Sequence, residues 1–263
     1  MAFTIPSYRL DPERFSNEVM RCKSIDPQRL EITESLTEIE FQKLGTLLGR
    51  FMDLTIAVKD LTQRNWSLEF LRFFPQTRSL HLKCLWSLES LDPISKLQYL
   101  TEIELGSLFN GALSLAPLVS LKKIKCCTVT GKWSDLFYLM KLQSLEKVVL
   151  SGFSGGDFNF ISELSQLREL EIVDSTLQDL SSLRSERVSS LRLSNLRNLS
   201  DLDWLMHFTK LRHLKLKSLP KVDRLPPQHF LDQLETFSAT HLKGAGIRNT
   251  VELEKREEGL FSS

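Results

Sequence analysis

The chain has 263 residues, of which 41% are hydrophobic and 25% are charged, and its formal net charge is +1. This near-neutral balance excludes a global attraction to nucleic acid or to an anionic membrane surface. The hydrophobic share is that of an ordinary soluble protein, and no stretch approaches the roughly 20 apolar residues of a membrane-spanning helix.

Residues 1–50 contain the first predicted elements but no clear repeat. The alternation of Leu30 and Ile32 predicts a short strand. Thr37 and Glu40 have the spacing of a capping box, which predicts that a helix begins there. We expect this region to form an N-terminal cap and the first irregular coils of the structure that follows.

From residue 51 to residue 242, a short apolar pattern returns with a period of about 22 residues. In its clearest copy, Leu170 and Ile172 place two apolar side chains on one face of a strand. A period of this length predicts a solenoid with one strand in each coil. The expected inward pairs are Leu80/Leu82, Ile103/Leu105, Ile124/Cys126, Val148/Leu150, Leu170/Ile172, Leu191/Leu193, Leu214/Leu216 and Phe237/Ala239.

This pattern resembles that of leucine-rich repeat proteins of the short-repeat subclass, whose repeats contain L-x-x-L-x-L-x-x-N. The resemblance implies an α/β fold, namely a right-handed, horseshoe-shaped solenoid with a parallel sheet on its concave face. It also implies a protein-binding function. The lead residues of the pattern are Thr77, Leu100, Leu121, Leu145, Leu167, Val188, Leu211 and Leu234.

The family's asparagine is missing from every repeat of this chain. Buried backbone groups at these turns are therefore expected to find partners in the main chain or in water. The residues at the asparagine positions are Leu85, Leu108, Val129, Phe153, Ser175, Leu196, Leu219 and Leu242.

After residue 242 the repeat stops, and residues 243–263 are expected to form a C-terminal cap or tail. The segment 251–258 is mostly charged, which fits a short polar helix and a frayed end equally well. At the other end, residues 1–10 lack the basic and apolar segments of a secretion signal. The four cysteines have no paired spacing, which favours a reducing compartment, and we expect the cytoplasm.

Two features of the sequence suggest chemistry. Gly152, Ser154 and Gly156 match the G-x-S-x-G pattern of a hydrolase nucleophile, which requires a helix directly after the serine and a nearby histidine and acid. Because the repeat resumes after these glycines, we interpret them as turn formers, and a serine hydrolase using Ser154 is the less favoured alternative. His81 and His213 are six coils apart, so no metal and no cofactor is expected.

Residues that alternate with the inward pairs are expected to point outward onto the concave sheet. They form patches of alternating sign, which serve either as solvated charges or as a charge-coded docking face. The patches are an acidic strip at Glu102 and Glu104, a basic patch at Lys123, Lys125 and Lys147, an acidic patch at Glu169 and Glu171 with Asp174 beside it, and a second basic patch at Arg192, Lys215 and Lys217 with His213 on the same face.

Trp86, Phe109 and Trp133 follow successive strands on one rim. They are either buried turn residues or, if exposed, anchors of a binding hot spot.

The sequence thus predicts a non-enzymatic module that recognises one folded protein partner through its concave face. Two versions stay open: a stoichiometric inhibitor, such as an immunity protein against a toxin, and a regulatory or scaffolding subunit of an enzyme. No membrane partner is expected. The interleaved acids argue against nucleic acid, because phosphate binding needs a continuous positive track.

Overall fold

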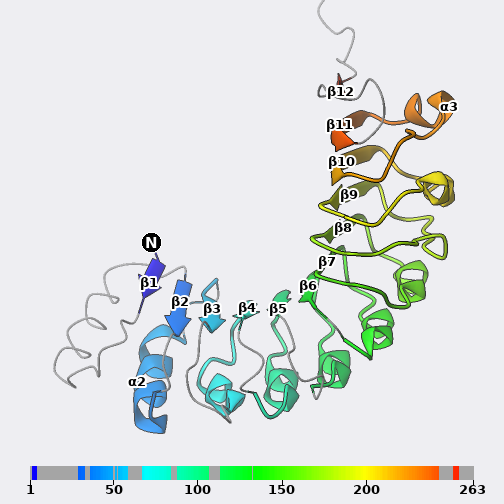
Figure 1. Cartoon of the computed structure of the whole chain (residues 1–263). Helices are drawn as coiled ribbons and strands as arrows, with labels where there is room; N and C mark the ends of the chain where they lie inside the picture. The colour runs from blue at the N-terminus through cyan, green and yellow to red at the C-terminus, as the bar shows by residue number, and fades with distance from the viewer. Residues whose placement is uncertain are drawn as a thin grey trace, which may run out of the picture. The chain divides into compact units, whose positions relative to one another are not determined.

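The computed structural model of the chain describes residues 2–4, 29–32, 36–49, 51, 53–58, 67–83, 88–106, 113–131, 133–242 and 251–254. The chain divides into two compact units, Met1–Leu145 and Glu146–Ser263. In each unit the strands lie side by side as a sheet, and helical segments lie on the other side of the coils (Figure 1).

The first unit is a run of short parallel strands, each paired with the next one in sequence. Its strands are β1 (Ala2–Thr4), β2 (Arg29–Ile32), β3 (Thr55–Val58), β4 (Ser79–Leu82), β5 (Glu102–Leu105) and β6 (Cys126–Thr130). Its helical segments are the α-helix α2 (Glu38–Leu48) and the 3-10 helices η1 (Leu68–Phe73), η3 (Asp92–Lys96), η4 (Ala116–Ser120) and η5 (Leu136–Lys141).

The second unit repeats this plan, with parallel pairing from β7 to β11. Its last strand, β12, pairs with β11 in the antiparallel direction, so the polar helix considered for this segment is wrong over the four residues described. The strands are β7 (Lys147–Ser151), β8 (Glu169–Val173), β9 (Ser190–Ser194), β10 (His213–Leu219), β11 (Thr236–Leu242) and β12 (Val251–Glu254). The helical segments are the 3-10 helices η6 (Asn159–Glu163) and η7 (Asp203–His207) and the α-helix α3 (Gln228–Leu231).

The predicted capping box is present at the start of α2. The backbone N–H of Glu40 donates to the hydroxyl of Thr37, and the carboxylate of Glu40 accepts from the backbone N–H of Thr37 at 2.7 Å. These two bonds satisfy N–H groups that have no partner inside the helix. Most other return segments are 3-10 helices of five or six residues.

The inward pairs of its strands form the sheet side of the core of the second unit. Leu170, Leu191, Leu214 and Phe237 lie opposite one another in successive strands, and all four are buried. Apart from Ser194, which is buried, the alternating outward residues are half-buried or exposed. The predicted α/β solenoid with a parallel sheet is therefore confirmed, whereas the domain boundaries at residues 50 and 242 stay predictions.

One coil of the first unit departs from the predicted register. In β6, Cys127 and Val129 lie opposite the inward pair of β5, so the predicted inward pair Ile124/Cys126 is wrong. Cys126 is half-buried and faces outward, whereas Cys127 is fully buried. Burial raises the pKa of the Cys127 thiol to about 12, so the thiol stays neutral and packs as a small apolar group.

Main-chain hydrogen bonds explain this register. The N–H groups of Lys125 and Cys126 both donate to the carbonyl oxygen of Thr101, at 2.7 and 3.0 Å. At the start of β5, β8, β9, β10 and β11, two successive N–H groups likewise donate to one carbonyl oxygen. In each of these strands, the first of the two N–H groups belongs to the residue directly after the lead residue. Ile124 therefore takes the lead position that the sequence pattern assigned to Leu121.

In the second unit, residues with left-handed backbone directly follow β7, β8 and β9 and are the next-to-last residues of β10 and β11. The φ values are 73° at Gly152, 50° at Asp174, 57° at Asn195, 54° at Ser218 and 56° at His241. The N–H groups of the first three donate to carbonyl oxygens of the following strand at 2.9–3.2 Å. These three N–H groups find main-chain partners, which is one of the two outcomes expected from the missing asparagines.

One of the missing asparagines is replaced by a buried serine. The Ser175 hydroxyl accepts from the N–H of Phe153 at 3.0 Å and donates to the carbonyl oxygen of Val173 at 2.7 Å. The Ser175 hydroxyl thereby forms a hydrogen bond between two neighbouring coils.

The substitution Ser218→Gly is expected to raise the free energy of unfolding by up to about 1 kcal/mol, because glycine adopts a positive φ without steric cost. Ser238→Gly, within β11, is the matched control. It should lower the stability, since glycine weakens a strand interior. Urea midpoints of the two variants check this, and a lower midpoint for Ser218→Gly would contradict it.

Candidate functional site

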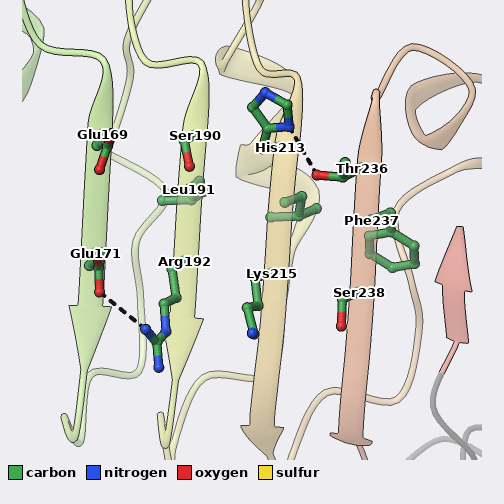
Figure 2. A pocket seen from close by; sticks show the side chains of 11 residues that line it. Glu169, Glu171, Ser190, Leu191, Arg192, His213, Lys215, Thr236, Phe237 and Ser238 are labelled. Atoms are coloured by element: carbon green, nitrogen blue, oxygen red, sulfur yellow. Dashed lines mark hydrogen bonds and ion pairs between the residues drawn. The ribbon is translucent and has the colours of Figure 1, made fainter. Parts of the chain in front are cut away.

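The sheet of the second unit has an open face across strands β8 to β11, which we call the β8–β11 face. Its outward side chains line a shallow hollow of about 430 Å³ (Figure 2). They form two rows across the strands, one of Glu171, Arg192, Lys215 and Ser238 and one of Glu169, Ser190, His213 and Thr236.

Ion pairs connect the charges at one end of this face. The ammonium of Lys147 lies 2.6 Å from a carboxylate oxygen of Glu171 and 3.3 Å from one of Glu169. The guanidinium of Arg192 lies 3.6 Å from the other oxygen of Glu171. The hydrogen bond with Glu171 raises the pKa of Lys147. The charges that the sequence placed in separate patches thus neutralise one another across adjacent strands.

Two further basic residues of the face lie on β10. Lys215 and Lys217 are exposed, and within the described ranges neither has an ion-pair partner. The His213 ring contacts the Thr236 hydroxyl at 2.9 Å and a carboxylate oxygen of Glu235 at 3.6 Å. Figure 2 shows Arg192 and Lys215 side by side on neighbouring strands.

The first predicted basic patch is not formed on the sheet. Because of the register of β6, the outward positions there belong to Cys126, Thr128 and Thr130. Lys125 directly precedes the strand, and Lys123 lies in the turn before it. The Lys123 ammonium sits 4.4 Å from the centre of the Tyr99 ring, a cation–π contact within the neighbouring coil.

Asp174 is also off the sheet face, at the left-handed turn after β8. Its carboxylate accepts from the side-chain amide of Asn195 at 2.7 Å. Together with Arg197, Ser218 and His241, these two residues line a second hollow of about 700 Å³ beside the strand ends. Asp174 therefore belongs to the rim and not to the acidic part of the face.

Of the three rim aromatics, the structure describes only Trp133; Trp86 and Phe109 lie outside the described residues. Trp133 is 7% exposed, and its indole N–H donates to the carbonyl oxygen of Thr130 at 3.1 Å. It is a buried turn residue, so it cannot act as an exposed anchor.

The sequence reasoning missed a polar cluster on the sheet of the first unit. The His81 ring lies 3.2 Å from Glu104, 3.5 Å from Glu102 and 3.5 Å from the guanidinium of Arg29. Ala57, at an outward position of β3 between Glu31 and His81, is fully buried. A small residue at an outward position between long polar ones is the signal that could have indicated the cluster.

The chemical alternatives find little support in the geometry. Ser154 lies exposed in a bend, and η6 begins only at Asn159, so no helix directly follows the serine. Gly152 and Gly156 have positive φ, which confirms their interpretation as turn formers. Among the described residues, no cluster of His, Cys, Asp and Glu is placed to hold a metal ion. In that same part of the chain, no helix is long and apolar enough to cross a membrane.

Comparison with known proteins gives similarities of fold. No protein-family model matches the sequence, and no curated protein matches it. An internalin, InlF from Listeria monocytogenes, is 15% identical with a TM-score of 0.52, covering 79% of this chain and 70% of that one. TLR13, in its complex with ssRNA13, is 16% identical with a TM-score of 0.61, covering 89% of this chain. The match spans 34% of the TLR13 chain.

Proposed function

We propose that this chain, whose fold is the leucine-rich repeat solenoid, is a non-catalytic module that binds one folded protein through the β8–β11 face. The observation that carries the proposal is the pair of polar rows on this face, set on strands whose inward residues are apolar and buried. An open solenoid face of this kind is a common place for binding a partner.

The rows are held in fixed positions. The inward residues Leu191 and Leu214 are at most 2% exposed, and the strands carrying them pair residue by residue. Neighbouring strands are about 4.8 Å apart, so the outward side chains have a set spacing. A surface that is already ordered loses less conformational entropy when a partner binds.

The chemistry of the hollow favours a protein surface over a small ligand. Small-molecule sites are deep and mostly apolar, with a few polar groups. Here the side chains that stand out from the sheet are carboxylates, basic groups, the imidazole of His213 and hydroxyl groups, and the hollow is open. A partner's polar surface can form hydrogen bonds across such a face, as the rim of a protein interface does.

Two versions of this function differ in whether the active site of the partner is covered. The protein is a stoichiometric inhibitor, as an immunity protein is, if it covers the active site of its partner. It is a regulatory or scaffolding subunit if the active site stays open. Titration of the partner's activity with this protein separates the two versions. We propose the cytoplasm as the compartment, as the cysteine spacing predicts.

A steric block of the face tests the proposal. The double variant Ser190→Trp and Ser238→Trp places two bulky side chains in the hollow without changing its charge. The control, Ser182→Trp with Ser200→Trp, alters exposed serines outside the sheet. In pull-downs from the source cell, we expect a protein that wild type and control retain and the blocked variant loses, at one-to-one stoichiometry after purification. Equal retention by all three forms would overturn the proposal, as would ester hydrolysis abolished by Ser154→Ala.

A further inference from the structure

Two lysines of the β8–β11 face have no ion-pair partner among the residues that the structure describes. Its two carboxylates, of Glu169 and Glu171, are paired with Lys147 and Arg192. Lys215 and Lys217 remain, both exposed and both on the outward side of β10. The nearest strand on the other side, β11, presents hydroxyl groups and no carboxylate at the facing positions. The excess charge of the face is therefore concentrated on one strand.

These cations are also crowded. Lys215 lies directly opposite Arg192 of the adjacent strand, and Lys217 follows two residues later on the same side. Like charges on neighbouring positions of a sheet face repel and destabilise it. Arg192 has a carboxylate at 3.6 Å, which offsets only its own charge. An anion placed over Lys215 would relieve this repulsion.

Hydroxyl groups, which are neutral hydrogen-bond donors, lie on the two strands beside Lys215. The hydroxyl of Ser238 lies in the row of Lys215, and that of Ser190 lies in the neighbouring row (Figure 2). Hydroxyl and ammonium groups are hydrogen-bond donors that suit carboxylate oxygens. Charge and hydrogen-bonding capacity thus favour the same class of ligand.

We infer that the β8–β11 face binds an acidic segment of its partner, with aspartate or glutamate side chains seated over Lys215 and Lys217. The inference rests on the proposed function and adds the chemistry of the partner. A nucleic-acid backbone fits less well, because Glu169 and Glu171 interrupt the positive track two strands away.

The test uses a defined anionic probe on the whole chain. Fluorescein-labelled octaglutamate, octaglutamine and an eight-residue oligothymidine are titrated with wild-type protein at low salt, and the anisotropy is followed. We expect octaglutamate to bind and octaglutamine not to bind. The double variant Lys215→Gln and Lys217→Gln should weaken octaglutamate binding at least about tenfold, and added salt should weaken wild-type binding as well.

The matched control neutralises two exposed lysines outside the face, Lys210→Gln and Lys221→Gln, and should bind octaglutamate as wild type does. Equal affinity of all three proteins for octaglutamate would overturn the inference. So would tighter binding of oligothymidine that is lost in the Lys215/Lys217 variant, because the face would then be a phosphate site. If that variant still captures the natural partner and only the tryptophan-blocked variant fails, the proposed function stands and the acidic partner is excluded.

Discussion

Replacing Leu170 by alanine is expected to lower the free energy of unfolding by about 2–5 kcal/mol, the range for truncating a buried leucine. Leu170 is 0% exposed and lies between Val148 and Leu191 in the register of β7, β8 and β9. The substitution removes apolar contacts on both sides and leaves a cavity that neighbouring coils fill only in part. Urea unfolding, followed by circular dichroism, measures the change.

The control for this experiment is Ile39→Ala. It removes the same number of carbon atoms from a side chain that is 65% exposed, so its effect should stay within about 0.5 kcal/mol. Comparable losses in the two variants would show that Leu170 is not a core residue.

A second large effect is expected from Phe208→Ala. This ring is 1% exposed and meets the Trp204 ring edge-on, with 5.7 Å between centroids and 71° between planes. Truncating a buried phenylalanine costs about 3–5 kcal/mol, and the loss of an aromatic pair contributes about 0.5–1.5 kcal/mol of the total. The decrease in the urea midpoint should therefore exceed that of most single variants in the second unit.

The comparison for Phe208 is the same substitution at Phe137, which is 54% exposed. Phe137 contacts only Tyr138 among the aromatic residues described, with 4.4 Å between the ring centroids. We expect Phe137→Ala to change the stability by less than about 1 kcal/mol. If Phe137→Ala were the more destabilising of the two, the assignment of the core side of the coils would be wrong.

The fold could be predicted from the sequence because one feature determines it. Leu170, Leu191 and Leu214 recur at nearly equal intervals, and each interval closes one coil. The register of one coil could not be predicted, because two frames of the pattern overlap there. Leu121-x-x-Ile124-x-Cys126 fits, and so does Ile124-x-x-Cys127-x-Val129. Only the second frame buries Val129, and pairing with β5 selects it.

The candidate site was predicted in part, and its errors have physical causes. The outward positions of β8 to β11 followed from alternation, so Glu169, Glu171, Arg192, His213 and Lys215 do lie on one face. Their ion pairs did not follow, because such contacts depend on rotamers that reach across strands. The His81 cluster was missed for the same reason.

The burial of Trp133 depends on the conformation of the turn after β6, and the period of the apolar residues does not predict that conformation. Its indole contacts the main chain three residues earlier, a local geometry that an apolar pattern does not specify.

The coils of this chain differ in length, and this difference bears on how the chain tolerates insertions and deletions. Paired strand residues are 24 positions apart between β5 and β6 and 21 apart between β8 and β9, yet both pairs of strands are in full register. The difference is taken up in the connecting turns. A residue gained or lost in a turn therefore alters only the local surface there, and the outward rows elsewhere keep their alignment. Turn length can vary in this architecture without disturbing the spacing that a bound partner would recognise.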